Sequence, residues 1–155
     1  MKTILSIYQV SNKGKTETLR EFANFILHSY PSFRSIFPAV AIVPPFGDFR
    51  LVVEVNGKII GIESEGDPNS NLKNRLLDLA DNFECDVILC TSRTKGKTID
   101  AVDNLYYTRG FETIWTSTYQ IENKSHHSLV NQLKAKHILD LLQSLGLLLS
   151  TKEEV

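Results

Sequence analysis

The tetrapeptide Lys-Gly-Lys-Thr occurs twice in the chain, at residues 13–16 and 95–98. Each copy follows an apolar, strand-like run and precedes a segment whose apolar residues recur at helical spacing. A strand that leads through such a turn into a helix can bind a polyphosphate, because backbone N–H groups at the helix N-terminus point at the anion and the lysine adds a positive charge. We expect one anion site rather than two, with the second turn leaning into the pocket of the first.

Composition excludes several classes of protein. The 155 residues fit a single domain over residues 1–150, followed by a polar tail at 151–155. A net charge of −1 argues against a general nucleic-acid binder, and no apolar run is long enough to span a membrane. The two cysteines suggest neither a disulfide framework nor a metal site. We therefore expect a soluble, cytoplasmic protein without a membrane partner.

Apolar spacing and turn residues predict alternating strands and helices. The clearest feature is a hairpin at Asn56-Gly57, a pair that favours a type I′ turn. The other elements predict a three-layer α/β/α domain whose mostly parallel sheet carries this hairpin at one edge. The expected strands are 3–8, 39–43, 49–55, 58–64, 86–91 and 112–120, the expected helices are 16–30, 69–80, 98–108 and 125–145, and 31–38 is expected to be a loop.

The last predicted helix has a leucine stripe, and the apolar residues 147–149 follow it. Such a tail, if exposed, favours contact with another protein surface. The sequence therefore allows a homodimer or a protein partner that binds through the C-terminal helix.

Residues 9–16, Gln-Val-Ser-Asn-Lys-Gly-Lys-Thr, resemble the phosphate-binding loop of P-loop NTPases, Gly-x-x-x-x-Gly-Lys-[Ser/Thr]. The loop departs from that pattern at Gln9, where the family has glycine. The resemblance implies that ATP or another nucleotide binds with Mg²⁺, and that Thr16 is a metal ligand. The implied nucleotide-binding residues of this loop are Ser11, Asn12, Lys13, Gly14, Lys15 and Thr16.

The order of elements is similar to that of small GTPases across most of the chain. Glu63-Ser64-Glu65-Gly66 stands where that family has Asp-x-x-Gly, with glutamate for aspartate. No Asn-Lys-x-Asp motif for reading guanine follows the strand expected at 112–120. The resemblance therefore implies a nucleotide but no preference for guanine.

If the strand order also resembles that superfamily, the strands that end near residues 8, 64 and 91 lie side by side. Their carboxyl ends would then share one crevice, which is the usual ligand site of open α/β sheets. That crevice would gather Lys15, Glu63, Asp67, Arg93 and Lys97. Mg²⁺ would be held by Thr16 together with Glu63 or another nearby carboxylate. Arg93 or Lys97 would stabilise the charge on a transferred phosphoryl group.

These features predict a nucleotide-binding, P-loop-like protein that hydrolyses a nucleoside triphosphate with Mg²⁺ or switches with it. One alternative is a non-catalytic binding or scaffold protein on a degenerate P-loop fold, which Gln9 favours. Another is an α/β enzyme that acts on the sugar or base of a nucleotide, with Glu63 or Asp67 as nucleophile or base.

Overall fold

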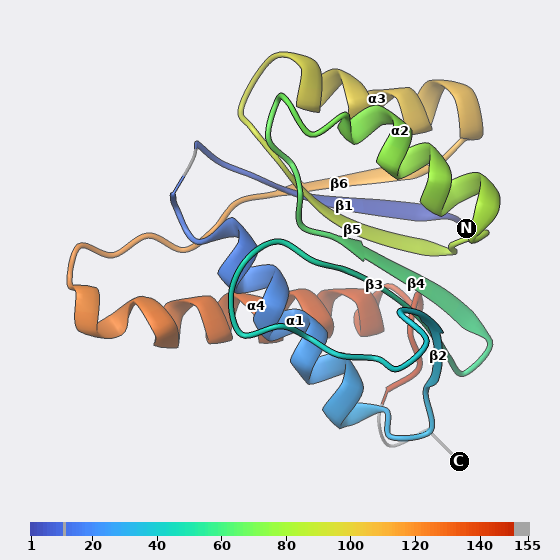
Figure 1. Ribbon diagram of the computed structural model, residues 1–155. Coiled ribbons are helices and arrows are strands. Elements are labelled where there is room, and N and C mark those ends of the chain that lie inside the picture. The colour runs from blue at the N-terminus through green and yellow to red at the C-terminus, as the bar shows by residue number, and fades with distance from the viewer. Residues whose placement is uncertain (11, 151–155) are drawn as a thin grey trace.

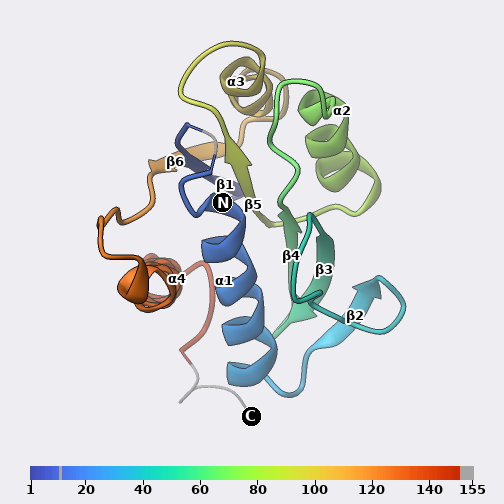
Figure 2. The same ribbon diagram turned by 60° about the vertical axis from the view of Figure 1, so that its left-hand side comes forward.

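Six strands form one sheet, with α1 and α4 on one face and α2 and α3 on the other (Figure 1 and Figure 2). This computed structural model describes residues 1–10 and 12–150, so the predicted tail at 151–155 lies outside it. The three-layer α/β/α prediction is confirmed. The elements are β1 (Thr3–Tyr8), α1 (Lys15–Ser29), β2 (Arg34–Phe37), β3 (Arg50–Val55), β4 (Lys58–Glu63), α2 (Leu72–Leu77), a π-helical turn (Asp78–Asn82), β5 (Val87–Ser92), α3 (Lys97–Arg109), β6 (Glu112–Thr116), a 3₁₀ turn (Lys124–His126) and α4 (His127–Ser144).

The sheet is mixed, so the prediction of a mostly parallel sheet is wrong. Its strand order is β2-β3-β4-β5-β1-β6. The pairs β4–β5, β5–β1 and β1–β6 are parallel, whereas β2–β3 and β3–β4 are antiparallel. The extra antiparallel pair arises because a third strand, β2, adds to the outer side of the predicted hairpin.

The position of β2 also corrects the sequence prediction. We expected a loop at 31–38 and a strand at 39–43, but the strand is Arg34–Phe37 and no strand forms at 39–43. Pairing with β3 explains the difference, because the hairpin offers a free edge to whichever segment reaches it first after α1. The hairpin itself is confirmed, with positive φ angles of 49° at Asn56 and 82° at Gly57, as a type I′ turn requires.

Apolar side chains pack on both faces of the sheet. One core lies beneath α1 and α4, and a second lies beneath α2 and α3. β5 is buried along its whole length, as expected for a strand covered on both faces. Within residues 1–10 and 12–150, no helix has both the length and the apolar character needed to cross a membrane.

The C-terminal apolar residues pack against the core, contrary to the expectation of an exposed tail. Leu147 and Leu148 are 6% and 2% exposed, and only Leu149 is substantially accessible, at 47%. The Tyr30 hydroxyl donates a hydrogen bond to the backbone carbonyl of Leu149, which fixes the segment against α1. A partner that binds through the C-terminal helix stays a prediction, and it would have to use the accessible leucines of α4.

The carboxyl ends of β4, β5 and β1 meet at one edge of the sheet, with β5 between the other two. The prediction that these three strands lie side by side is therefore confirmed. One loop leaves each of these three strand ends and joins its strand to the helix that follows it, α2, α3 or α1 (Figure 1). The predicted site residues that the structure describes lie on these loops or at the adjoining ends of the strands and helices.

Candidate functional site

The loop from β1 to α1 ends in a left-handed turn. Gly14, the residue before α1, has φ 83°, a conformation that glycine adopts without strain. It supplies no side-chain cap, so the first backbone N–H groups of α1 are not satisfied by a capping side chain. The predicted residue Ser11 lies outside the described part of the chain. The turn therefore presents a helix N-terminus suited to an anion.

Lys15 is held across the ends of two strands. Its ammonium donates hydrogen bonds to the carbonyl oxygens of Gln9, at 2.8 Å, and Ser92, at 3.2 Å. The residue is only 8% exposed, and burial lowers the pKa of its ammonium, with a further lowering from Arg93. An ammonium has three donors, so this geometry leaves one for a ligand.

A cavity of about 380 Å³, here called the loop cavity, lies against this turn. It brings together most of the predicted phosphate-binding residues with three carboxylates. Its lining consists of Asn12, Lys13, Gly14, Lys15, Thr16, Glu17, Asp48 and Asp67.

Asp48 is a residue that the sequence analysis missed. Its carboxylate accepts a hydrogen bond from the Ser64 hydroxyl at 3.0 Å and lies 3.5 Å from the hydroxyl of Thr16. Arg20 fixes the preceding loop by donating to the carbonyls of Pro44, at 2.6 Å, and Gly47, at 3.0 Å. A carboxylate is thereby held beside the threonine predicted to bind a metal.

A signal for Asp48 was present in the hairpin. The two-residue turn fixes the register of β3 against β4, so that Arg50 pairs with Glu63. A residue just before β3 must therefore lie beside the carboxyl end of β4, where the site was expected.

Asp67 and Arg93 meet across the loops that follow β4 and β5. The Arg93 guanidinium donates to one carboxylate oxygen of Asp67 at 3.0 and 3.1 Å. The backbone N–H of Arg93 donates to the hydroxyl of Thr98 at 2.8 Å, which ties this loop to the start of α3. Asp67 lines the loop cavity, so the prediction that this pair lies near Lys15 agrees with the geometry.

Glu63 points elsewhere. It is 1% exposed, and its carboxylate accepts a hydrogen bond from Arg50 at 2.8 Å, with Arg75 of α2 at 3.7 Å. Burial raises the pKa of Glu63, and the neighbouring Arg50 partly opposes this rise. Glu63 does not line the loop cavity, so its contacts link β3, β4 and α2 rather than Thr16.

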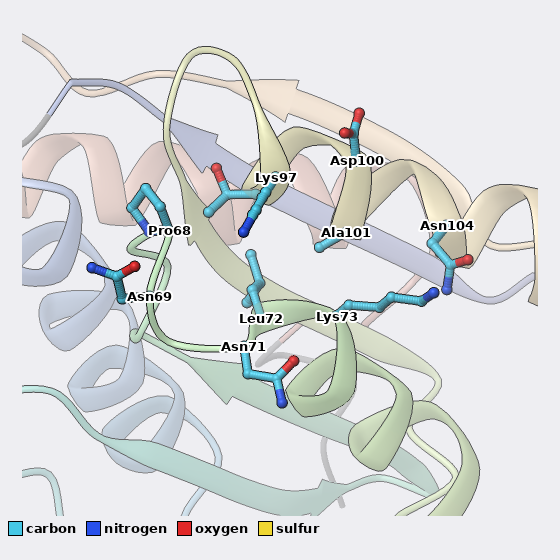
Figure 3. Close-up of a pocket in the computed structure, with 10 residues that line it drawn as sticks. Pro68, Asn69, Asn71, Leu72, Lys73, Lys97, Asp100, Ala101 and Asn104 are labelled. Carbon is cyan, nitrogen blue, oxygen red and sulfur yellow. The ribbon is translucent and has the colours of Figure 1, made fainter.

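Lys97 lines a different space. A cavity of about 630 Å³, here called the α2–α3 cavity, lies between these two helices and includes Lys97 in its wall (Figure 3). The two Lys-Gly-Lys-Thr turns therefore border separate cavities. The loop after β4 joins them, because Asp67 lines the first and Pro68 lines the second.

The loop after β6 borders the turn before α1 on its other side. The Gln120 amide donates to the carbonyl of Lys13 at 2.7 Å. A third cavity, of about 400 Å³, lies here and shares Asn12 and Lys13 with the loop cavity. Residues 112–120 are rich in β-favouring types and predict a strand, but β6 ends at Thr116 and residues 117–120 belong to this loop, whose contact with the turn the sequence pattern does not reveal.

No group of three or more histidine, cysteine, aspartate or glutamate residues in the described chain could hold a metal ion by itself. Mg²⁺ is commonly bound by one or two carboxylates together with phosphate oxygens. Thr16, Asp48 and Asp67 all line the loop cavity, so they could hold such an ion only together with oxygens from a ligand.

Comparison of the chain with protein-family models, with curated proteins and with solved structures finds no match in any of the three.

Proposed function

We propose that the loop cavity binds the phosphates of a nucleoside triphosphate together with Mg²⁺. The observation that supports this most directly is the position of Lys15, whose ammonium is fixed by two strand-end carbonyls beside an uncapped helix N-terminus. Phosphate oxygens would take the remaining ammonium donor and the first N–H groups of α1. The site would then work as the P-loop-like turn that the sequence resembles.

The charges around the loop cavity favour a metal complex over a free polyphosphate. Two lysines, Lys13 and Lys15, face three carboxylates, Glu17, Asp48 and Asp67. Glu17 is paired with Arg20 and Asp67 with Arg93, so Asp48 is the carboxylate of this lining that would repel a bare triphosphate. A Mg²⁺ ion that bridges phosphate oxygens to Thr16 and Asp48 would reverse this repulsion.

The base would lie on the side of the loop after β6. The third cavity continues from the loop cavity through Asn12 and Lys13, and Ile121 offers it an apolar surface. A nucleotide with its phosphates on the turn can reach this space, because the two cavities share part of their lining. A preference for ATP over other nucleotides stays open in this proposal.

Turnover would be slow. Glu63, the buried carboxylate at the end of β4, is paired with Arg50 and is not in the loop cavity. Asp67 is the carboxylate best placed to orient a water molecule, and it is paired with Arg93. Release of Arg93 from Asp67 towards the terminal phosphate would supply both a charge stabiliser and a free carboxylate.

Binding without hydrolysis is the second candidate function. Two observations favour it: Gln9 replaces the first glycine of the family pattern, and the Asp67–Arg93 ion pair occupies both groups that hydrolysis would use. Such a protein would act as a nucleotide-responsive binding or scaffold protein.

Calorimetry with ATP, GTP and their diphosphates, each with and without Mg²⁺, tests the proposal. We expect saturable binding of at least one triphosphate with Mg²⁺ and at least about tenfold weaker binding with chelator, from the charge argument above. Lys15→Ala should weaken binding about tenfold or more, whereas Lys58→Ala at the exposed start of β4 should leave it unchanged. Absence of binding for every nucleotide at millimolar concentration would contradict the proposal.

Release of inorganic phosphate separates the two candidate functions. Slow, Mg²⁺-dependent release that Arg93→Ala and Asp67→Asn both reduce would support hydrolysis. Tight binding with no release above the background rate would support the binding-only function.

A further inference from the structure

The α2–α3 cavity is larger than the loop cavity, at about 630 Å³ against about 380 Å³. The nucleotide proposed above does not occupy it. Its volume lies within the range of 300–1,000 Å³ that is usual for small-molecule sites. Lys97 and Thr98 of the second Lys-Gly-Lys-Thr turn line the α2–α3 cavity. Neither residue lines the cavity of the proposed nucleotide site.

Polar groups from both helices converge on this cavity. Lys73 extends from α2 towards Asn104 of α3, and the Lys97 side chain reaches from the start of α3 towards the loop that precedes α2 (Figure 3). Asn69 and Asn71 add two more amides at the loop side. Within residues 1–10 and 12–150, none of these five side chains has a hydrogen-bond or ion-pair partner, so all of them are free to bind a ligand.

The floor of the cavity is apolar. Leu72 and Ala101, each 3% exposed, face each other between the two helices. A flat or compact organic group can rest on this floor while its polar edges meet the asparagine amides. Most of the lining is polar, so Pro68, Leu72 and Ala101 supply the apolar part of a mainly hydrophilic site.

The charge of the lining favours an anion. Two lysines and one aspartate, Asp100, contribute a net positive charge. The Asp100 carboxylate points away from α2, whereas both ammonium groups border the space between the helices (Figure 3). A phosphate monoester is a suitable partner, because ammonium groups bind phosphate oxygens through charge-assisted hydrogen bonds.

We propose that the α2–α3 cavity is a second ligand site, which binds a small phosphate monoester whose organic part carries hydrogen-bonding groups. The phosphate contacts Lys97, and the organic part lies on Leu72 and Ala101 with its polar edge towards the asparagines and Lys73. This site is separate from the proposed nucleotide site, and its existence does not depend on nucleotide binding to the turn before α1.

A calorimetric titration with adenosine monophosphate tests this inference. We expect saturable binding, at least tenfold weaker in Lys97→Ala and in Asn104→Ala. Lys95→Ala is the matched control, because Lys95 is an exposed lysine of the same turn that does not line the cavity. Affinity equal to that of the unmodified chain is expected for Lys95→Ala and for Lys15→Ala.

Ribose 5-phosphate, adenosine and inorganic phosphate serve as comparison ligands. Binding of ribose 5-phosphate with the same dependence on Lys97 would assign the site to sugar phosphates, and binding of adenosine monophosphate alone would assign it to nucleotides. Failure of both esters to saturate at 10 mM would overturn the inference. Loss of adenosine monophosphate binding in Lys15→Ala but not in Lys97→Ala would also overturn it, because the ligand would then occupy the loop cavity.

Discussion

Lys15 combines a nearly buried position with a positive charge. Its ammonium is satisfied only in part by the carbonyls of Gln9 and Ser92, and burial makes the charged form less favourable. A ligand phosphate would stabilise that charge. The residue best placed to bind an anion is therefore also one whose charge depends on pH.

Binding of Mg²⁺–ATP should weaken at alkaline pH because of Lys15. The pKa of this ammonium is lowered by burial, so deprotonation begins at lower pH than for an exposed lysine. As pH rises through that lowered pKa, the charge is lost and affinity falls. Lys15→Arg keeps its charge, so its affinity, whatever its starting value, should stay constant over the same range.

Calorimetry from about pH 7.5 to about pH 9.5 measures this difference, since an ordinary lysine stays charged over most of that range. Equal pH profiles for the original chain and Lys15→Arg would show that Lys15 is not the group that titrates.

The Glu63–Arg50 ion pair should be important for stability rather than for chemistry. Glu63 is 1% exposed and Arg50 is 15% exposed, so Glu63→Ala removes one of the two carboxylates that pair with a largely buried guanidinium in the described part of the chain. We expect a loss of roughly 3 kcal/mol in the free energy of unfolding, measured by urea denaturation.

The Arg34–Glu54 pair on the neighbouring strands is a matched control. Its side chains are 65% and 30% exposed, so Glu54→Ala should cost less than about 1 kcal/mol. Similar costs for the two glutamate variants would contradict a structural role for the buried pair.

At the scale of elements, the segment that follows β4 controls the geometry of both proposed sites. It passes so close to β5 that a Cβ atom on Gly66 would lie 2.0 Å from the carbonyl oxygen of Thr91. The Thr91 hydroxyl also donates to the carbonyl of Ser64 at 2.7 Å. Asp67 and Pro68, which line the two cavities, follow directly.

Gly66→Ala should therefore destabilise the fold by about 2 kcal/mol or more and should weaken binding at the loop cavity. The cause is a clash with backbone, which no side-chain rotation relieves. Gly57→Ala is the control: it has open space but a φ of 82°, so it should cost about 1 kcal/mol and leave ligand binding unchanged. Denaturation and ATP titration of both variants measure the two effects, and unchanged ATP affinity in Gly66→Ala would contradict the link between this segment and the site.

Much of the element order could be predicted because local signals agreed with the tertiary structure. The turn at Asn56-Gly57 and the apolar run at β5 are examples in which turn chemistry and burial point the same way. β2 could not be predicted, because Arg-Ser-Ile-Phe gains its strand conformation from pairing with β3 rather than from its own pattern. Local pattern does not reveal which segment an open sheet edge will recruit.

The site was predictable in part for the same reason. Lys15 and Asp67 were found because they follow the carboxyl ends of parallel strands, which meet at one edge. Lys97 also follows such a strand, yet the helix it opens lies on the opposite face of the sheet from α1, so its side chain borders another cavity. Strand order alone does not determine on which face of the sheet the side chain of a residue after a strand will lie.

At the scale of the whole molecule, the C-terminal segment closes the layer formed by α1 and α4. The sequence predicts that leucines 147–149 are exposed to a partner. In the structure, Leu147 and Leu148 are instead buried in the core of this layer. The segment thus stabilises the helix that carries the proposed phosphate turn, because α1 packs against α4 beside it.

Truncation of single leucines separates this core role from a partner role. Leu148 is 2% exposed, so Leu148→Ala should lower the free energy of unfolding by about 2 kcal/mol or more, because the change removes buried apolar contacts and leaves a cavity. Leu149 is 47% exposed, so Leu149→Ala should change stability by less than about 0.5 kcal/mol. Chemical denaturation at two or more protein concentrations measures both values. If Leu149→Ala were the more damaging change, or if its effect grew with protein concentration, the exposed leucine would belong to an interface between copies of the chain, because the stability of an oligomer depends on concentration and that of a monomer does not.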